Sequence, residues 1–524
     1  MPEIKISISE ISRHNKEDDC WIVVDNVVWN ITAFAPSHPG GPDIIYHYAG
    51  RDASVAYDEI HAPSIISNGL PANARKGVLD EATITEEWKN QQEQRQRQDR
   101  HISPSTSKAT TINPSKPPLS SIINLRDFEL AAKATATPKT WAFYSSASDD
   151  VITRDLNNSL LTRILLRPRV MRRVSQITTT TRAPFPGIDF ESSFPLFISP
   201  AAMARLIHPD GELAIARACK TKGIVQCISN NASYTAADIV SQPEVRDQPF
   251  IFQLYVNRNR TESEKLIAKI CALPNIKGVM VTTDAAAAGK READERVKAD
   301  ESVKNPMMGA GGAAKNDSKG GGYGRLMGDF IDPNLNWEDI SWLRANLKDL
   351  PLFLKGVMSA DDVLLALQHG CEGVVLSNHG GRNLDTSPPA ILVLLEVWKR
   401  FPHVITQHHP HSPAVRSGQN KAFSVLIDGG VRRGTDILKA VCLGATAVGV
   451  GRPALFATGY GQEGVEHMID ILKDEFEVAM RNSGITRVGD VGPEYVNTGD
   501  IDRLVATGPG HSYAVGWRER GSKL

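Results

Sequence analysis

The sequence predicts a multidomain protein in which a small N-terminal domain precedes an α/β TIM (β/α)8 barrel. A chain of 524 residues is too long for one hydrophobic core. From Glu86 to Pro118 the composition shifts to Gln, Arg, Ser, Thr and Pro, which is typical of a linker with little to bury. After this linker, short apolar runs alternate with helical stretches, and this alternation indicates repeated βα units.

Eight of these apolar runs are expected to form the barrel. They are residues 196–199, 225–229, 251–255, 278–283, 352–356, 373–377, 424–428 and 447–451. The active site of such a barrel lies at the C-terminal ends of its strands, so the residues at the ends of the runs are the candidates for chemistry.

The N-terminal domain is indicated by two β-type runs, residues 20–24 and 27–32, about a turn at Asp25-Asn26. The motif His38-Pro39-Gly40-Gly41 follows, then Ala49-Gly50-Arg51-Asp52-Ala53, and then His61. The proline fixes the backbone beside the first histidine, and the glycines allow a tight turn where a flat macrocycle must approach.

These motifs, within about residues 4–80, resemble the cytochrome b5 family. The resemblance implies an α+β fold that binds haem b, with His38 and His61 as the axial ligands of the iron. Two axial imidazoles leave no position for oxygen or substrate, so this haem should carry single electrons.

The bulk composition excludes several other classes of protein. A formal net charge of −1 argues against a nucleic-acid binder, and the absence of an apolar run of 18 residues argues against a membrane span, so we expect a soluble protein. The six cysteines lie far apart, which predicts reduced thiols rather than a zinc site or disulfides. The N-terminus leaves no room for a signal peptide, and the final Ser522-Lys523-Leu524 predicts peroxisomal import.

Two insertions interrupt the βα repeat. Residues 293–325 are rich in Gly, Lys and Asp, and we expect a lid-like or disordered loop rather than a phosphate loop, because no strand directly precedes them. The second insertion contains His403, His408, His409 and His411. These could bind a metal, but their place before the seventh strand favours a surface loop on the face away from the chemistry.

The segment Ser377-Asn378-His379-Gly380-Gly381-Arg382-Asn383-Leu384-Asp385 resembles the FMN-dependent L-2-hydroxy-acid dehydrogenase and oxidase family. The resemblance extends over about residues 120–500, and together with the haem motifs it is similar to the flavocytochrome b2 family, which oxidises L-lactate and reduces cytochrome c. We therefore expect a haem domain at residues 1–82, a linker at 83–118, an FMN-binding barrel at 119–500 and a tail at 501–524.

Oxidation of a 2-hydroxy acid needs a base against a clamped substrate. The resemblance implies that His379 is this base and that Asp284 stabilises its protonated form, although an aspartate after a strand can also cap a helix. Arg382 and Arg291 would bind the substrate carboxylate with their planar guanidinium groups, and Tyr255 would contact the substrate hydroxyl.

The resemblance also implies a set of FMN-binding residues. Lys355 is a charged residue that closes an apolar strand, so it needs a negative partner, expected to be the N1/O2 edge of reduced flavin. Gln253, Ser229 and Thr282 would contact the flavin ring. Two glycine-rich turns at the ends of strands seven and eight would bind the rest of the cofactor, with Asp428 on the ribityl hydroxyls and Gly430, Arg432, Gly451 and Arg452 on the phosphate.

The sequence departs from the family at two places. Phe143 stands where the family has a tyrosine whose hydroxyl binds the substrate carboxylate, so one hydrogen bond is missing and electron transfer to the haem is also in question. Asn231 stands where lactate-using relatives have an apolar residue against the substrate side chain. We therefore predict that L-lactate is a poorer substrate than some other L-2-hydroxy acid.

Three functions remain open from the sequence. The first is oxidation of a lactate-like L-2-hydroxy acid to the 2-oxo acid, with electrons passing from FMN to the haem and then to a one-electron acceptor such as a cytochrome. The second is a peroxisomal oxidase that reduces O2 to hydrogen peroxide. The third is a non-catalytic electron carrier or binding protein, and in each case a homotetramer would be usual for the family.

Overall fold

The structure is a computed structural model of the chain. It describes residues 4–38, 42–54, 57, 66, 70–85, 88, 116–182, 184–298, 322–328 and 330–506. The chain divides into two compact units, an N-terminal unit and a larger unit that begins at Lys116. Most of the expected linker, the middle of the lid-like insertion and the Ser522-Lys523-Leu524 segment lie outside the described residues.

The N-terminal unit is built on a sheet with the order β1-β6-β4-β3-β2, and β5 pairs with β3 on one side of this path. The strands are β1 Lys5–Ile6, β2 Asn15–Lys16, β3 Asp19–Val24, β4 Val27–Asn30, β5 Arg51–Asp52 and β6 Arg75–Leu79, and the helices include α1 Ile8–Ile11 and α2 Pro42–His47.

The hairpin expected near the N-terminus is present as β3 and β4. Asp25 and Asn26 both have positive φ, 51° and 63°, which is the backbone conformation of a two-residue hairpin turn that Asp and Asn tolerate. β4 ends at Asn30, two residues earlier than predicted, because the Asn30 side chain accepts a hydrogen bond from the Thr32 amide at 3.1 Å and turns the chain out of the ladder.

Side chains alternate across this hairpin. Ile22 and Val24 pack into one hydrophobic cluster together with Trp29, whereas Val23 and Val28 pack into another. Both faces of the sheet are therefore covered by apolar contacts, as the period of two residues in a strand requires.

The larger unit is a closed barrel of eight parallel strands, β10 to β17, in sequential order, with β17 returning to β10. The strands are β10 Leu196–Ile198, β11 Val225–Ile228, β12 Phe250–Leu254, β13 Ile276–Thr282, β14 Leu352–Val357, β15 Gly373–Leu376, β16 Ser424–Asp428 and β17 Val448–Val450. All eight strands predicted from the sequence are confirmed, and so is the TIM-barrel fold.

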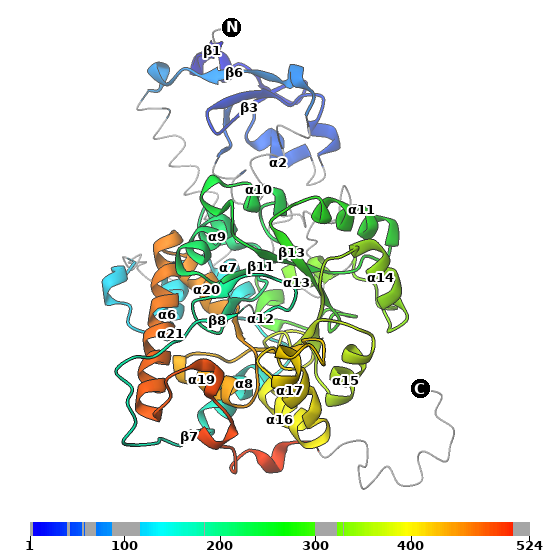
Figure 1. Ribbon diagram of the computed structural model, residues 1–524. Coiled ribbons are helices and arrows are strands. Elements are labelled where there is room, and N and C mark those ends of the chain that lie inside the picture. Colours follow the sequence, from blue (N-terminus) through cyan, green and yellow to red (C-terminus); the bar gives the residue numbers. More distant parts are fainter. Residues whose placement is uncertain are drawn as a thin grey trace. The chain divides into compact units, whose positions relative to one another are not determined.

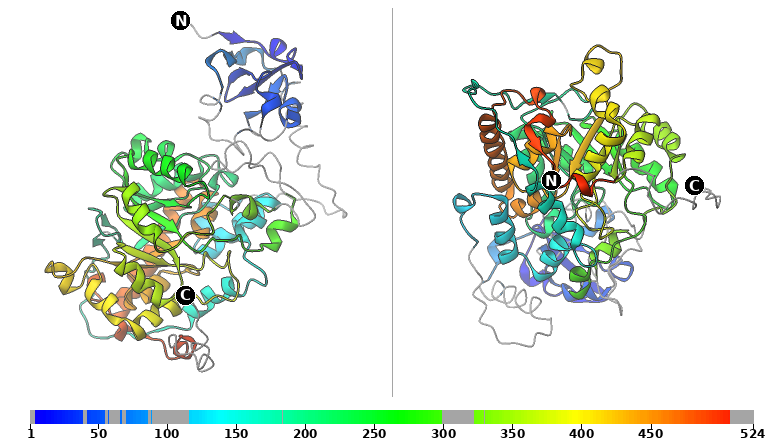
Figure 2. Two further views of the ribbon diagram at one scale, coloured as in Figure 1. Left: turned by 90° about the vertical axis from the view of Figure 1, so that its right-hand side faces the viewer. Right: turned by 90° about the horizontal axis from the view of Figure 1, so that it is seen from below.

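The helices surround these strands (Figures 1 and 2). In chain order they are α6 Leu125–Thr135, α7 Pro138–Ser145, α8 Ile152–Thr162, α9 Gly211–Lys222, α10 Ala236–Val240, α11 Arg260–Cys271, α12 Glu292–Arg296, α13 Tyr323–Gly328, α14 Asp339–Leu347, α15 Ala360–Gln368, α16 Ala390–Arg400, α17 Pro402–His408, α18 Pro413–Arg416, α19 Gly434–Cys442, α20 Arg452–Thr458 and α21 Gly461–Ser483. The long helix α21 packs along α9, α19 and α20.

The barrel interior is filled at the end opposite the candidate site. Phe185, from the segment before β10, makes edge-to-face contacts with Phe197 of β10 and Phe353 of β14, and all three side chains are fully buried. Each buried phenylalanine contributes roughly 1.5 to 3 kcal/mol through the hydrophobic effect. This packing leaves the C-terminal ends of the strands as the open face.

Two expectations are corrected. Lys355 does not close its strand, because β14 runs on to Val357 with an irregular register at Gly356, whose φ is +99°. The histidine-rich insertion is not a simple surface loop but forms the short helices α17 and α18. His411 bonds Thr181 through its ring at 2.9 Å, and among the described residues no cluster of His, Cys, Asp or Glu is arranged to bind a metal ion.

All six cysteines are unpaired, and all but Cys271 are buried. Within the part of the chain that the structure describes, no helix has both the length and the apolar character needed to span a membrane.

Candidate active site

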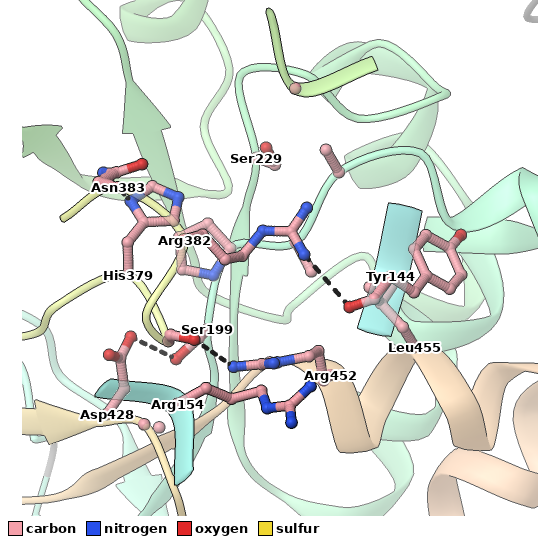
Figure 3. Close-up of a pocket in the computed structure, with 18 of the residues that line it drawn as sticks. Tyr144, Arg154, Ser199, Ser229, His379, Arg382, Asn383, Asp428, Arg452 and Leu455 are labelled. Carbon is pink, nitrogen blue, oxygen red and sulfur yellow. Dashed lines mark hydrogen bonds between the residues drawn. The ribbon is translucent and has the colours of Figure 1, made fainter. Parts of the chain in front are cut away.

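The C-terminal ends of the barrel strands surround one large cavity (Figure 3). Most of the residues expected at the site line it: Ser229, Tyr255, Arg291, Lys355, His379, Arg382, Asp428, Gly430, Arg432, Gly451 and Arg452. The other three, Asp284, Gln253 and Thr282, are hydrogen-bonded to side chains that line the cavity or to each other. The structure thus brings together residues from seven different strand ends.

His379 lies on a sharp turn after β15. It has a φ of 58°, and the next two residues, Gly380 and Gly381, also have positive φ. A left-handed conformation is uncommon for residues other than glycine, although histidine adopts it more readily than most, and strained residues cluster at functional sites. The Ser377 hydroxyl accepts the His379 amide at 3.1 Å, and the Asn378 side chain exchanges two hydrogen bonds, of 2.9 and 2.7 Å, with Asn157 of α8.

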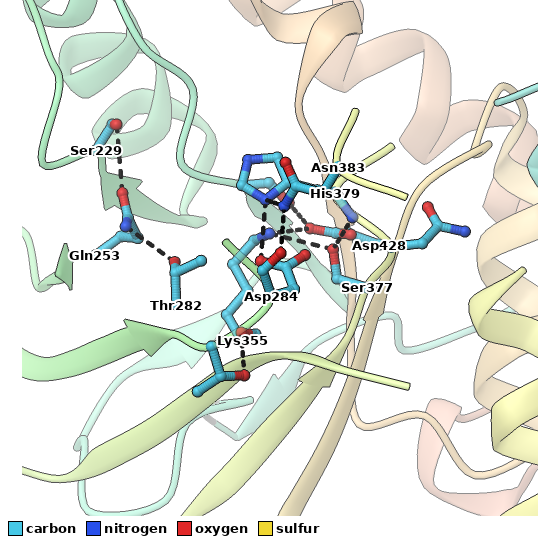
Figure 4. A network of polar contacts seen from close by, with 12 residues as sticks. Ser229, Gln253, Thr282, Asp284, Lys355, Ser377, His379, Asn383 and Asp428 are labelled. Carbon is cyan, nitrogen blue, oxygen red and sulfur yellow. Dashed lines mark hydrogen bonds and ion pairs between the residues drawn. The ribbon is translucent and has the colours of Figure 1, made fainter. Parts of the chain in front are cut away.

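The two ring nitrogens of His379 face different partners (Figure 4). Nδ1 lies 3.2 Å from Asp284 Oδ1 and 3.1 Å from Asn383 Nδ2, whereas Nε2 lies 3.4 Å from the Tyr255 hydroxyl. Gly356 permits this arrangement, because a Cβ there would lie 2.5 Å from the Asp284 side chain. The carboxylate therefore fixes the ring on one side and leaves Nε2 facing the cavity.

The pKa values of His379 and Asp284 both lie below their ordinary values, which favours a neutral imidazole and a charged carboxylate. Burial lowers the pKa of His379, and Lys355 and Arg291 lower it further, although Asp284 partly opposes them. Burial alone would raise the pKa of Asp284, but the interaction with His379 and the charge of Lys355 hold it below its ordinary value. At neutral pH this favours a neutral imidazole beside an ionised carboxylate, which is the state of a general base ready to accept a proton.

Lys355 is almost completely buried, and its ammonium group has a hydrogen-bond partner and a charged partner within the barrel. Its Nζ donates to the Ser377 hydroxyl at 3.1 Å and lies 3.8 Å from Asp428 Oδ2, which also accepts a hydrogen bond from Ser199 at 3.1 Å. Burial lowers the pKa of the ammonium, but Asp428 and Asp284 outweigh it and keep the pKa above its ordinary value. Lys355 therefore remains a positive charge at the floor of the cavity.

Gln253, Ser229 and Thr282 form a chain of hydrogen bonds across three strands. Gln253 donates to Thr282 Oγ1 at 2.9 Å, and its carbonyl oxygen accepts from Ser229 Oγ at 3.4 Å and from the Asn230 amide at 3.1 Å. Of these side chains only Ser229 lines the cavity directly.

Arg291 is buried and Arg382 is half-buried, and among the described residues no carboxylate lies within hydrogen-bond distance of either guanidinium group. Arg382 donates to the carbonyl oxygens of Phe143, Tyr144 and Ser146 at 2.9 to 3.2 Å, and Arg291 donates to the carbonyl oxygen of Arg382 at 3.2 Å. Burial lowers the pKa of both guanidinium groups, and for Arg382 the nearby Arg291 and Arg452 lower it further. Two positive groups so close together favour the binding of an anionic group.

A second positive region lies on the Asp428 side of the cavity. Arg452 donates to the carbonyl oxygen of Gly380, and burial together with Arg154 and Arg432 lowers its pKa to about 10. Figure 3 shows Arg154 and Arg452 side by side near Asp428. Arg432 is not free, because it forms a 2.5 Å ion pair with Glu129 of α6.

Glycine is required on this side of the cavity. A Cβ on Gly430, which has a φ of +82°, would lie 2.3 Å from the backbone of Asn157. The Asn158 side chain also donates to the Gly430 carbonyl oxygen at 2.8 Å. Helix α8 therefore packs directly on the glycine-rich turn, and the half-buried Arg452, which lines the same cavity, is suited to a phosphate group.

Phe143 lies in the cavity wall, as its place in the sequence suggested. Its ring packs against the Arg382 guanidinium with 5.1 Å between ring centroid and Cζ, so it supplies a contact to the cation but no hydroxyl. The neighbouring Tyr144 does not replace that hydroxyl, because its own hydroxyl donates to the Met203 carbonyl oxygen at 2.6 Å.

Sequence reasoning missed several residues of the site. Asn383 and Ser377 belong to the segment that identified the family, so their proximity to His379 was a usable signal. Ser199 directly follows the apolar core of the first strand and was a second signal. Arg154 had no signal, because it lies on α8, outside the strands, and only the folded chain brings it to the cavity.

Of the two expected haem ligands, the structure describes one. His38 follows a short 3-10 helix, Ala35–Ser37, and its ring makes an edge contact with Phe34 at a centroid distance of 5.7 Å. His61 lies outside the described residues, so the ligand pair stays a prediction.

Comparison with known protein families separates the same two parts of the chain. Residues 7–80 match the cytochrome b5-like haem/steroid binding domain, and residues 132–498 match the FMN-dependent dehydrogenase family. L-lactate dehydrogenase (cytochrome) of Wickerhamomyces anomalus is 37% identical over 503 residues, which cover 95% of this chain and 81% of the relative. The Saccharomyces cerevisiae protein of the same description is 36% identical over 512 residues, covering 95% and 80%.

Other relatives align with the barrel part. Glycolate oxidase 3 of Arabidopsis thaliana is 33% identical over 390 residues, covering 72% of this chain and 96% of the relative. Among solved structures, a flavocytochrome b2 variant with pyruvate bound superimposes with a TM-score of 0.62 at 34% identity, covering 78% of this chain and 94% of that one. A mandelate oxidase with (S)-4-hydroxymandelic acid gives 0.61 at 30% identity, covering 72% and 98%.

Proposed function

The chain belongs to the FMN-dependent dehydrogenase family and carries a cytochrome b5-like haem domain, and we propose that it oxidises a small L-2-hydroxy acid with His379 as the base. It is an FMN-dependent oxidoreductase, and its second cofactor is haem. The observation that carries the assignment of residues is the His379–Asp284 pair, which faces the same cavity as Arg291 and Arg382.

The substrate class follows from the relatives. Those that align along 95% of the chain are named L-lactate dehydrogenase (cytochrome), and those that align with the barrel alone include glycolate oxidases. Lactate and glycolate are both small 2-hydroxy acids, and a carboxylate of that size matches the two arginines.

Each side chain then has a distinct task. Arg382 and Arg291 bind the carboxylate, Tyr255 donates a hydrogen bond to the substrate hydroxyl, and His379 Nε2 accepts the proton that the oxidation releases. Asp284 stabilises the imidazolium that results, because an ionised carboxylate at 3.2 Å favours the charged ring.

The residues present fit FMN. Arg452 lies half-buried near Arg154 and Arg432, and a phosphate next to Gly430 and Gly451 would neutralise this positive charge. Asp428 would bind the ribityl hydroxyls, Lys355 the polar edge of the ring, and Ser229, Gln253 and Thr282 the remaining ring atoms. Bound there, FMN would supply a two-electron acceptor, and haem would supply a one-electron carrier.

We propose that His38 and His61 hold the haem iron and that a one-electron acceptor such as a cytochrome receives the electrons. Transfer to O2 with formation of hydrogen peroxide is the second candidate, favoured by the similarity to glycolate oxidases. A homotetramer and the peroxisomal location expected from Ser522-Lys523-Leu524 both stay predictions.

Anaerobic mixing of the purified holoprotein with a panel of L-2-hydroxy acids tests the proposal, with flavin and haem absorbance followed separately. Flavin bleaching followed by haem reduction supports the dehydrogenase. Flavin bleaching with an oxidised haem and rapid oxygen consumption supports the oxidase, and no bleaching with any acid contradicts both.

A further inference from the structure

We propose that Asn231 selects substrates in which the third carbon carries a hydroxyl group, so that the enzyme prefers 2,3-dihydroxy acids to 2-hydroxy acids with apolar side chains. This inference rests on the proposed function and specifies its substrate class.

Asn231 is held rigidly at the cavity wall. It follows β11, its backbone amide donates to Ser229 Oγ at 3.1 Å, and its carbonyl oxygen accepts from the Met203 amide at 3.3 Å. Its side chain lines the cavity that also contains His379 and Tyr255, and the residue is only 3% exposed. Because the backbone is fixed on both sides, the amide cannot turn away to bulk solvent.

The amide of Asn231 is not satisfied within the described part of the protein. Its Oδ1 is buried and has no hydrogen-bond partner there. The lining of the same cavity also includes small or apolar side chains, namely Ala201, Ala202, Ala285, Ala287, Ala288 and Ile331. A buried amide left unpaired is costly, so this position favours a ligand with a polar group.

The other polar groups of the substrate already have partners. Arg291 and Arg382 take the carboxylate, and Tyr255 and His379 take the 2-hydroxyl. Only the side chain on the second carbon remains for Asn231, which lines the same cavity.

The chemistry of the amide defines that group. A side-chain amide has two N–H donors and one carbonyl oxygen acceptor, and a hydroxyl can pair with either group in whichever orientation the amide takes. A methyl group satisfies neither. A second carboxylate or an ammonium would need an opposite charge, which Asn231 does not have. L-glycerate is the smallest acid that meets these requirements.

The test compares L-glycerate with L-2-hydroxybutyrate, whose side chains have the same number of non-hydrogen atoms and differ only in a terminal hydroxyl or methyl. Flavin bleaching in the anaerobic holoenzyme gives a rate constant per substrate concentration for each acid, and L-lactate is measured beside them. We expect L-glycerate to be favoured over L-2-hydroxybutyrate by about tenfold or more, because a site built to bond a hydroxyl rejects the isostere that lacks it. Equal rates, or faster bleaching with L-2-hydroxybutyrate, would overturn the inference.

Two variants test whether the preference for L-glycerate depends on Asn231. Asn231→Leu should remove the preference for L-glycerate or reverse it, whereas Asn230→Leu, which removes the neighbouring buried amide that does not line the cavity, should keep the ratio. If Asn231→Leu loses FMN, as read from its absorbance, the smaller Asn231→Ala makes the same comparison. A variant at Asn231 that keeps the full preference overturns the inference. Failure of all three acids to bleach the wild-type flavin would instead contradict the proposed function.

Discussion

The two sides of the cavity hold their charged side chains in different ways. On the strand side, charges lie in compensated pairs, with His379 beside Asp284 and Lys355 beside Asp428. On the side of α7, Arg382 is held by three backbone carbonyl oxygens, which orient the guanidinium but do not cancel its charge. The difference separates two tasks, because a base needs a partner that stabilises its charged form, whereas an anion-binding arginine must keep its charge for the ligand.

The largest effect is expected from removing the base. His379→Gln should lower the rate of flavin reduction on the order of 10³- to 10⁴-fold, since that is the usual contribution of a general base at the upper end of its range. FMN absorbance should remain, because the His379 side chain is not among the proposed cofactor contacts. Full activity in this variant would show that another group accepts the proton.

Removing the charge of Asp284 while keeping the size of its side chain should lower the rate of flavin reduction less than removing His379 does. Asp284→Asn keeps a hydrogen-bonding partner for His379 but removes the charge, and we expect a loss of about 10²-fold in the rate of flavin reduction. Asp284 raises the pKa of His379, so the variant should also move the acid limb of the pH profile to lower pH. A limb that moves to higher pH would contradict the assigned role of Asp284.

The carbonyl-bound side is tested by Arg382→Lys. All three bonds to carbonyl oxygens come from Nη1, so a lysine keeps the charge and one such nitrogen but loses Nε and Nη2, which the planar guanidinium offers to an anion. We expect a loss of roughly 10- to 100-fold in kcat/KM, mainly through KM, measured in steady state. The control is Arg163→Lys, at an arginine that does not line the cavity and whose partner Asp500 is a carboxylate that tolerates a point charge. A loss in the control as large as in Arg382→Lys would contradict a specific role for the guanidinium of Arg382.

Phe143→Tyr sharpens the comparison by adding a donor to the α7 side. The new hydroxyl would bond the substrate carboxylate, and a hydrogen bond to a charged group of about 1.5 kcal/mol corresponds to roughly a tenfold gain in kcat/KM. The change should leave the position of Arg382 intact, because Arg382 bonds the backbone of residue 143 rather than its side chain. A decrease in kcat/KM would show that the ring contact with the guanidinium matters more than the missing hydroxyl.

The smallest expected effect is the pH dependence of kcat/KM in the unmodified protein. Because burial lowers the pKa of His379 below its ordinary value of 6.5, the imidazole stays neutral and active through neutral pH. In a profile of kcat/KM against pH, activity should fall on the acid side with a midpoint below 6.5. A midpoint well above that value would mean that another group titrates.

The strands and their terminal residues were predictable because a barrel strand is short, apolar and followed by a polar residue. His379 and Asp284 follow such strands within three residues, whereas Lys355 lies inside β14. The α7 side was less predictable, since the contacts of Arg382 go to backbone carbonyl oxygens, which every residue has. No side-chain pattern distinguishes the three positions that serve Arg382.

Contacts between residues far apart in the sequence were also not predictable from the sequence. The pairing of Arg432 with Glu129 turns an expected phosphate ligand partly toward α6, and no spacing in the sequence relates two residues so far apart. Arg154 is similar, because an arginine on an amphipathic helix is usually a solvent contact. In the N-terminal unit, the hairpin was predictable from Asp25-Asn26, whereas the role of His61 still rests on resemblance alone.

The amide pair between Asn157 and Asn378 has a consequence for the order in which the protein is made. Its partners are separated by 221 residues, whereas the N-terminal sheet closes when Lys5 pairs with Val78. At about 5 to 20 residues per second, a ribosome needs on the order of 10 to 40 s to reach Asn378 after Asn157. The haem module can therefore complete its sheet while the barrel is still being synthesised, and the FMN site forms last, after α20 has emerged.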